Sequence, residues 1–299
     1  MLPSYAADND RPLTAIGLVV GTVFLFSLSD IVTKHLTMKH PVELVVAVRY
    51  LASLLLLFAF AWPRVGNSLW KTVRTRWVIG RGVILTLASL TLGYALRLMP
   101  VGETISIMYL FPILVMLLAI PLLREQVSRV GWSLAILGFL GVLMILRPGG
   151  GLDSVGVVLA LLNAGLAAVF HLITRVLTKT ESNLSLLFYA TLVGAVCFGL
   201  AALPSLAGPL PNWEDLGLMV LLGLISTSGH FLFTVAYQYA PASLIAPANY
   251  MHLVWAALLS WIFFSHLPDQ WTLLGMLMIV TAGVGIAIKT HLDKIRQPA

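Results

Sequence analysis

Residues 184–203 read LSLLFYATLVGAVCFGLAAL, a run of twenty residues without a formal charge. A helix of about 20 apolar residues is long enough to cross the hydrocarbon core of a bilayer. An uncharged run of this length is therefore the strongest sequence signal for a membrane span. The run also holds Cys197, the single cysteine of the chain, so neither a disulfide framework nor a cysteine-based metal site is possible.

The rest of the chain has a similar composition. Of its 299 residues, 59% are hydrophobic and only 10% are charged, whereas roughly a quarter of the residues in a soluble globular protein are charged. This excludes the common cytosolic enzymes, and the abundance of apolar side chains excludes disorder. The net charge of +6 comes from basic residues scattered over short gaps, which does not indicate a nucleic-acid partner. We predict an integral membrane protein whose partner is the lipid bilayer.

Nine further runs resemble the first one, and the connectors between them are too short for a soluble domain. The first run is not a cleavable signal peptide, because Asp8 and Asp10 precede it instead of a basic cluster. The predicted fold is all-α with ten transmembrane helices, flanked by an N-terminal segment 1–12 and a C-terminal tail 290–299. The expected spans are 13–33, 42–62, 77–97, 101–122, 129–147, 154–177, 184–203, 215–238, 242–264 and 270–289.

The basic residues indicate how the helices are oriented. If the N-terminus is cytoplasmic, twelve basic residues fall in the inner connectors and termini, and only four in the outer connectors. Lysine and arginine are enriched on the cytoplasmic side of membrane proteins. We therefore expect a multi-pass protein of the inner membrane with both termini in the cytoplasm. The four outer residues are Lys34, Lys39, Arg97 and Arg147.

The two halves of the chain are similar at a constant offset of 141 residues. Segment 30–36 (DIVTKHL) matches segment 171–177 (HLITRVL). Three single positions also match: Gly82 with Gly223, Pro100 with Pro241 and Tyr109 with Tyr250. We infer two five-helix units, 13–147 and 154–289. Because each unit has an odd number of spans, the second must enter the membrane from the opposite side. Inverted repeats around a central cavity are common in secondary transporters.

The stretch from Pro112 through Glu125 to Gly141-Val142-Leu143 resembles the fourth and fifth helices of the drug/metabolite transporter superfamily, specifically its EamA-type members. In the second half, the stretch from Trp255 through Gly283-Val284-Gly285 is similar, but His266 stands where the family usually repeats the glutamate. The resemblance covers essentially the whole chain. It implies a basket-like bundle with a central cavity, in which the fifth and tenth helices are peripheral.

Charged groups inside a membrane are costly unless they are paired or hydrated, so each one is a candidate functional residue. Asp30 and Arg49 lie at similar expected depth in the first two spans. They are either a gate and a clamp for a substrate carboxylate or a structural ion pair. Glu103 opens the fourth helix, where it either complements the positive helix N-terminus or couples transport to protons. Arg81, near the inner end of the third span, is expected to snorkel to the surface.

Polar and aromatic side chains recur at helical spacing in several spans, which indicates faces that point to protein or water and away from lipid. We expect these faces to line one cavity. Pro112 and Pro247 are predicted bend points, and the glycines of the fifth and tenth spans are predicted to allow close helix contact. The candidate substrate-binding residues are Arg49, Tyr94, Tyr109, Asn163, His171, His230, Tyr237, Tyr250, His252 and Trp255.

Motifs of nucleotide-driven or enzymatic function do not occur. The sequence has no G-x-x-x-x-G-K-[ST] phosphate loop and no H-E-x-x-H helix, so no cofactor, no metal and no enzymatic activity are expected. We predict a monomeric secondary transporter that exports small metabolites by alternating access, with amino acids, including aromatic ones, as the leading substrates. The alternative is a transporter of another metabolite or a cationic drug in the same fold. An intramembrane hydrolase and a channel are less favoured rivals.

Overall fold

The structure is a computed structural model of the chain. It describes residues 12–111, 113–115, 117–118, 129–146, 151–177, 180–239 and 246–296, and their regular secondary structure is entirely helical. The predicted all-α class is confirmed for these residues. The helices are α1 (Pro12–Thr37), α2 (Val42–Val65), η1 (Gly66–Trp70), α3 (Thr75–Leu98), α4 (Val101–Met108), α6 (Arg129–Ile145), α7 (Ser154–Leu177), α8 (Asn183–Ala201), η2 (Leu203–Ala207), α9 (Trp213–Tyr239), η3 (Ala246–Tyr250), α11 (Met251–Phe264) and α12 (Gln270–Arg296).

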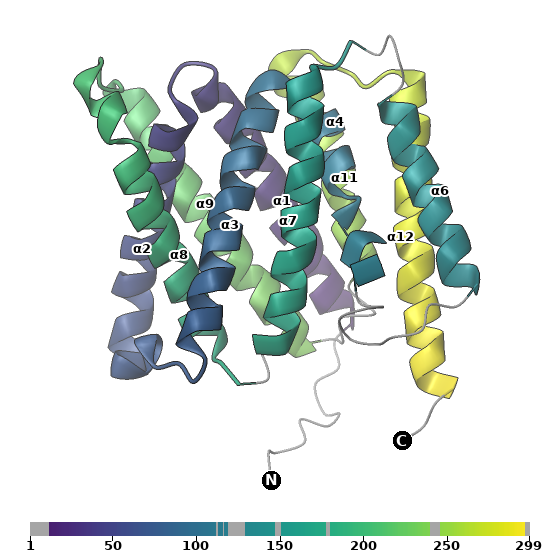
Figure 1. Cartoon of the computed structure of the whole chain (residues 1–299), viewed down its shortest axis with the longest axis horizontal. Helices are drawn as coiled ribbons and strands as arrows, with labels where there is room; N and C mark the ends of the chain where they lie inside the picture. The colour runs from purple at the N-terminus through teal and green to yellow at the C-terminus, as the bar shows by residue number, and fades with distance from the viewer. Residues whose placement is uncertain are drawn as a thin grey trace.

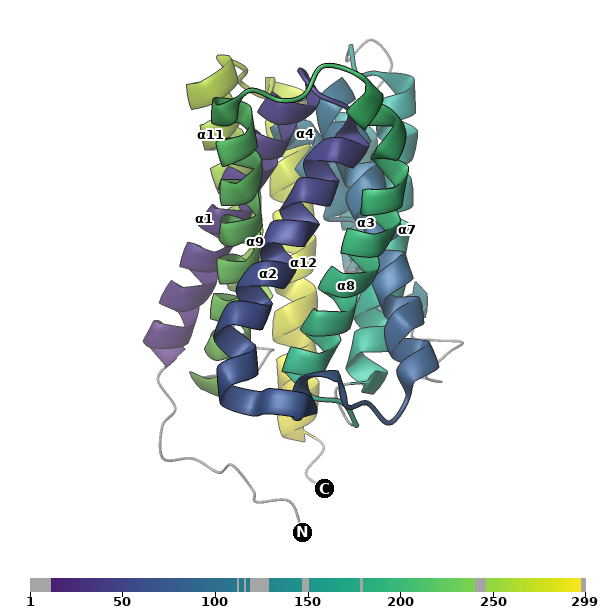
Figure 2. The same ribbon diagram turned by 90° about the vertical axis from the view of Figure 1, so that its left-hand side faces the viewer.

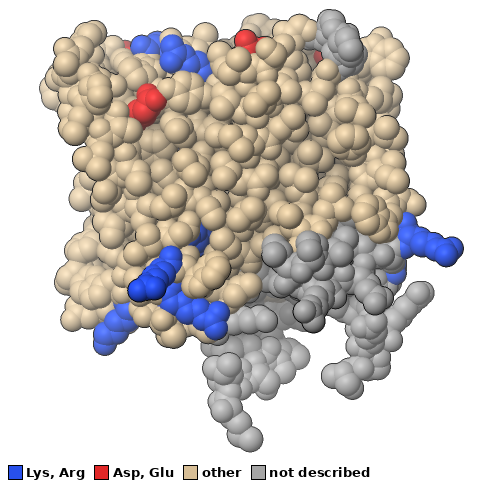
Figure 3. Space-filling model, viewed as in Figure 1, with Lys and Arg blue, Asp and Glu red and all other residues tan. Residues whose placement is uncertain are grey.

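Each predicted apolar run corresponds to helix in the described part of the chain. There, six helices are long and apolar enough to cross a bilayer, and four apolar helical segments are shorter. The helices stand side by side, and α1 begins at the same end of the bundle at which α12 finishes (Figure 1). On the face shown in Figure 3, charged side chains gather toward the two ends and leave an almost uncharged band between them. Such a band matches the requirement of a lipid-facing surface.

Several helices begin where a side-chain oxygen accepts a backbone hydrogen bond from three residues further on. Asp153, Asn212 and Asp269 each accept from the i+3 amide at 2.7–2.8 Å, and Ser182 does so at 3.0 Å. A free amide at a helix N-terminus must find an acceptor, and short polar side chains supply it. These four caps start α7, α9, α12 and α8, so the connector residues determine where the spans of the second half begin.

Two of the predicted spans are not continuous α-helices. The fourth run is α-helical from Val101 to Met108 and then turns at Tyr109, and the ninth run opens with the 3₁₀ helix η3 before α11 starts at Met251. Pro112 and Pro247 are close to these breaks, and proline has no N–H for the helical hydrogen-bond ladder. The breaks fall at Tyr109 and Tyr250, the pair of positions that match at the 141-residue offset.

Each long helix packs against a small number of other helices. Helix α1 contacts α9 and α11, α3 contacts α7 and α8, α2 contacts α8 and α9, and α4 contacts α7 and α11. Helices α6 and α12 pack on each other at one edge of the bundle (Figure 1). In Figure 2, which is viewed from the opposite edge, α12 lies behind α2 and α8. Most neighbours therefore come from opposite halves of the sequence.

Glycines make the α6–α12 contact possible, as predicted. A Cβ atom placed on Gly141 would lie 2.7 Å from the carbonyl oxygen of Gly275, and one placed on Gly275 would lie 2.5 Å from the carbonyl oxygen of Gly141. Both obstacles are backbone atoms, which cannot rotate away as a flexible side chain does. The two helices approach so closely that only hydrogen fits between them at this crossing.

We expect Gly275→Leu to destabilise the protein by about 1–3 kcal/mol, the usual cost of inserting atoms into a packed contact. Gly199→Leu in α8 is the matched control, because a Cβ there meets nothing within 4 Å. Thermal unfolding of the purified protein in detergent measures the difference. Equal melting temperatures for the two variants would show that the α6–α12 approach does not limit stability.

Candidate functional site

The structure brings four aromatic rings together around the break in α4. Tyr109 lies with its ring centroid 5.3 Å from Tyr250, 5.7 Å from His252 and 5.8 Å from Phe111. Its hydroxyl donates a hydrogen bond to the carbonyl oxygen of Asn249 at 2.8 Å. Three of the rings, those of Tyr109, Tyr250 and His252, are buried. The ring contact between Tyr109 and Tyr250 therefore joins the helix break of the first half to the helix break of the second half.

Further rings extend this contact in two directions. On one side, Phe111 stacks on His171 at 4.8 Å and 13°, and Phe170 meets the edge of His171 at 5.6 Å. On the other side, Phe26 contacts His252 at 6.4 Å and His230 at 5.0 Å. We call this set the ring cluster. Its members are Phe26, Tyr109, Phe111, Phe170, His171, His230, Tyr250 and His252.

The ring cluster is buried in the middle and accessible at its two ends. His171 and His230 are exposed, although each ring stands against a phenylalanine of the cluster. The cluster draws on α1, the segment directly after α4, α7, α9, η3 and α11, which come from both halves of the sequence. The arrangement offers faces and edges of rings, together with imidazole nitrogens, to a bound molecule.

His252 of the ring cluster also makes a buried contact with a carboxylate. The Nε2 atom of His252 is 3.0 Å from Oδ2 of Asp30, and both side chains are about nine-tenths buried. The hydroxyl of Ser27 donates to the carbonyl oxygen of His252 at 3.3 Å. Of the two alternatives for Asp30 and Arg49, the structure does not show the structural ion pair between them. The fold instead packs α11 against α1, and His252 of α11 contacts the carboxylate of Asp30.

Arg49 has polar and aromatic partners in place of a carboxylate. Its Nη2 atom donates to Ser89 at 3.0 Å, and its guanidinium lies 4.7 Å from the ring centroid of Tyr50. The Tyr50 hydroxyl in turn lies 2.7 Å from the same serine oxygen. The side chain is only half-buried, so a guanidinium within the bundle remains reachable.

Arg81 does not snorkel to the surface, contrary to expectation. It is buried, and it donates through Nε to Thr174 at 2.7 Å and through Nη1 to the carbonyl oxygen of Leu186 at 3.1 Å. Its guanidinium lies 4.2 Å from the ring centroid of Phe170. The partners on α7 and α8 hold it inside the bundle, next to the ring cluster.

Glu103 forms a second carboxylate–histidine contact at the end of the bundle away from the termini. Its Oε1 atom is 2.9 Å from Nε2 of His266, and its carboxylate is buried. A hollow of about 150 Å³ adjoins the pair. Lys34, near the end of α1, donates to the carbonyl oxygens of Leu96 and Met99 at 2.8 and 2.7 Å and so caps α3.

Three of the candidate residues have partners outside the ring cluster. The hydroxyl of Tyr94 donates to Glu43, Asn163 donates to the carbonyl oxygen of Ala88, and Trp255 packs edge-on against Phe24. Each of these contacts connects neighbouring helices or contributes to the packing between them. The side chain of Tyr237, together with Pro112 and Glu125, lies outside the described residues.

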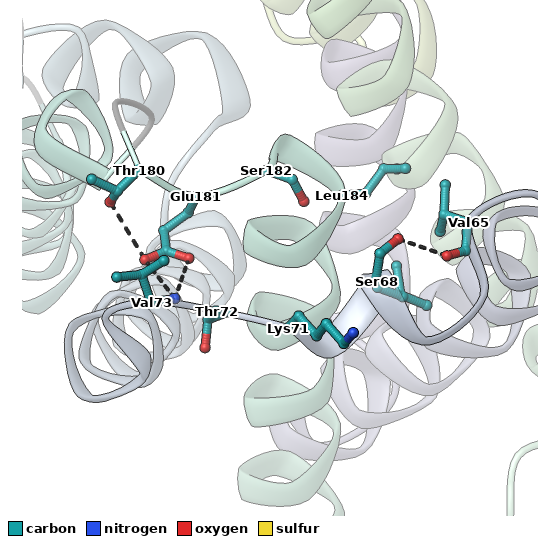
Figure 4. A pocket seen from close by; sticks show the side chains of 10 residues that line it. Val65, Ser68, Lys71, Thr72, Val73, Thr180, Glu181, Ser182 and Leu184 are labelled. Carbon is teal, nitrogen blue, oxygen red and sulfur yellow. Dashed lines mark hydrogen bonds between the residues drawn. The ribbon is translucent and has the colours of Figure 1, made fainter.

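Sequence reasoning missed Glu181, which ties two connectors together at the end of the bundle where the termini lie. Its carboxylate accepts hydrogen bonds from the amides of Val73 and Arg74 and from the hydroxyl of Thr180 (Figure 4). Glu181, Val73 and Thr180 line a hollow of about 430 Å³. The available signal was a lone acidic residue in a short connector, directly before the N-cap Ser182. Phe111 was also missed, because one phenylalanine among many has no distinguishing sequence pattern.

The comparisons with known proteins identify the family. The model of the EamA-like transporter family matches residues 13–147 and again residues 154–288. The chain belongs to the EamA-like transporter family. The resemblance to EamA-type drug/metabolite transporters is thereby confirmed, and the protein is a multi-pass membrane transporter and not a member of an enzyme family. The two matches coincide closely with the two units predicted from the 141-residue offset.

Three named relatives differ in what they carry. An S-adenosylmethionine uptake transporter of Rickettsia felis is 29% identical over 90% of this chain and 91% of its own length. A riboflavin transporter of Rhizobium johnstonii is 27% identical over 99% and 98%, and a pseudopaline exporter, CntI, of Pseudomonas aeruginosa is 26% identical over 90% and 94%. The names include both uptake and export and no amino-acid exporter. The expected export of amino acids is therefore not supported.

The Asp30–His252 contact predicts a large energetic coupling. Removing one partner of a buried hydrogen bond leaves the other polar group buried without a partner, which costs about 1–3 kcal/mol and more for a charged group. We expect Asp30→Asn and His252→Gln each to be destabilising, and the double variant to cost clearly less than their sum. Denaturant titration in detergent micelles measures the four members of the cycle.

The pair between Lys39 and Asp215 is the control for this cycle. Its atoms are 3.2 Å apart, but about half of the lysine side chain is exposed, so a coupling of about 0–1 kcal/mol is expected. Additive losses for Asp30 and His252 would show that their contact contributes no specific stabilisation.

Proposed function

We propose that the protein is a secondary transporter of the bacterial plasma membrane that carries small metabolites bearing an aromatic or heterocyclic ring. The observation that carries the proposal is the ring cluster, which joins helices of both halves and is accessible at His171 and His230. Rings bind favourably to other rings in offset or edge-on geometry. A transporter also needs its binding site between two bodies that move relative to each other.

We further propose that the two halves are inverted repeats and that the chain crosses the membrane ten times. Exchange of the halves maps α1, α2, α3 and α4 onto α7, α8, α9 and α11. Under this exchange, the α1–α9 contact becomes α7–α3, α2–α9 becomes α8–α3, and α1–α11 becomes α7–α4, and all six contacts occur. Helices α1 and α7 also run in opposite directions along the bundle (Figure 1). These relations support alternating access by movement of one half against the other.

The orientation with both termini in the cytoplasm is part of the same proposal. The connector 63–76 carries Arg64, Lys71, Arg74 and Arg76 and lies at the end of the bundle where α1 begins and α12 finishes (Figure 1). A cluster of basic residues in a short connector favours the cytoplasmic side.

A labelling experiment tests this orientation. In a Cys197→Ser background, a membrane-impermeant thiol reagent added to intact cells should not label Asn67→Cys, because that residue lies in the basic connector end. It should label Gly208→Cys, which is exposed at the opposite end between η2 and α9. Efficient labelling at position 67 with none at position 208 would reverse the orientation.

Transport assays test the substrate class. Purified protein in liposomes is challenged with radiolabelled compounds that include S-adenosylmethionine, riboflavin and aliphatic metabolites of similar size. We expect Phe26→Ala and Phe111→Ala to weaken the binding of ring-bearing substrates by about 2- to 10-fold, since a ring–ring contact contributes about 0.5–1.5 kcal/mol. Phe263→Ala, on the exposed outer surface of α11, is the control. Equal losses for ring-bearing and aliphatic substrates would indicate packing damage and not recognition.

A further inference from the structure

Four basic side chains from four helices belong to the ring cluster or lie on helices that pack against it. They are Arg49 on α2, Arg81 on α3, His171 on α7 and His230 on α9. The guanidinium of Arg81 lies 4.2 Å from the ring centroid of Phe170, which also contacts His171. Arg49 lies where α2 crosses α9, the helix of His230, because a Cβ placed on Gly223 of α9 would be 2.7 Å from the carbonyl oxygen of Arg49. We call these four residues the basic group. Two of its members come from each half of the chain.

Five acidic side chains of the described residues have other partners. Asp30 contacts His252, Glu103 contacts His266, and Asp215 contacts Lys39 and His40. Glu181 takes backbone amides, and Glu43 takes the hydroxyl of Tyr94. The two arginines contact hydroxyls, a carbonyl oxygen and ring faces. Two guanidinium charges thus stand inside membrane helices without a described carboxylate partner.

Such an arrangement is costly unless it has a function. A guanidinium within a membrane segment is expensive, and such residues face a wet or functional space and pair with an anion where they can. Arg49 is half-buried and His171 and His230 are exposed, so an anion can reach three of the four. Arg81 is held by hydrogen bonds to Thr174 and to the carbonyl oxygen of Leu186. Its guanidinium stands against the ring of Phe170 and adds positive potential at the ring cluster.

We propose that the basic group binds an anionic substituent, a carboxylate or a phosphate, on the ring-bearing molecule that the protein transports. The inference rests on the proposed function, because His171 and His230 belong to both the basic group and the ring cluster. Arg49 supplies planar guanidinium donors that match the oxygens of either anion. The ring of the molecule lies against the cluster while its anionic group lies toward Arg49.

Binding of simple probes to the full-length protein in detergent tests the proposal. The probes share a benzene ring and differ in charge: phenyl phosphate, benzoate, benzyl alcohol and benzylamine. We expect the two anions to bind at least about tenfold more tightly than the alcohol, and benzylamine no better than the alcohol. The ratio of phenyl phosphate to benzoate affinity distinguishes a phosphate from a carboxylate. Added sodium chloride should weaken binding of the anions alone, because salt screens the attraction.

Variants connect the preference to the basic group. Arg49→Gln should lower the affinity for phenyl phosphate at least about tenfold and leave benzyl alcohol unchanged. Arg49→Lys keeps the charge, and it provides the test if the glutamine variant does not fold; it should lose part of the affinity, because lysine lacks the planar donors. Arg64→Gln is the matched control, since Arg64 is an exposed residue that bonds only the carbonyl oxygen of Phe60.

The outcomes separate this inference from the proposed function. If all ring probes bind equally and Arg49 variants change nothing, the anion inference fails while ring recognition stands. Tighter binding of benzylamine than of benzoate also overturns it and indicates a cationic substrate. If no ring probe binds while an aliphatic metabolite is transported, ring recognition fails and the inference fails with it.

Discussion

The requirement that every polar group in the hydrocarbon core finds a partner determines the rest of this structure. Backbone groups meet it by forming helices, and the hydroxyls within the helices meet it locally. Thr86, Ser106 and Thr191 each donate to the carbonyl oxygen of the residue four positions earlier, at 2.6–3.1 Å. Side chains that carry charge have no such local solution. They must find partners on other helices. The partner of each charged residue therefore shows which helices lie next to each other.

The sequence was sufficient for the features that depend on local pattern. The apolar runs predicted the helices, because a membrane span is a property of about 20 consecutive residues. The 141-residue offset predicted two units, and the family model matches the chain twice. The offset also pairs Tyr109 with Tyr250, whose rings are in contact. The glycines of α6 and α12 indicated a close crossing, since small residues have few other uses at regular positions in a membrane helix.

Partners that meet through the tertiary fold were beyond sequence reasoning. Asp30 and Arg49 are close in the sequence, yet their partners are His252 and Ser89. Arg81 sits where an arginine usually snorkels, but Thr174 and the carbonyl oxygen of Leu186 lie within reach once α7 and α8 pack against α3. The polar stripes predicted that His171, His230 and His252 line one cavity, and the structure places all three in the ring cluster. They did not show that Asn163 would instead tie α7 to α3.

The carboxylates connect the two halves of the chain more often than they connect neighbours in sequence. Asp30 and Glu103 of the first half take His252 and His266 of the second. Asp215 of the second half takes Lys39 and His40 of the first, and Glu181 takes the amides of Val73 and Arg74. The first three contacts lie within the bundle or toward the end away from the termini, while the Glu181 contact closes the opposite end (Figure 4).

Rocking of one half against the other would strain these contacts in opposite senses at the two ends, because a movement that opens one end closes the other. Each contact is a hydrogen bond to a charged group, worth roughly 1.5–3 kcal/mol. Two conformations of similar free energy are possible only if the ties lost at one end are replaced at the other. The Asp30–His252 contact differs from the end contacts because both side chains are about nine-tenths buried. Breaking it would leave a buried polar group without a partner, which costs more than breaking a contact that water can replace.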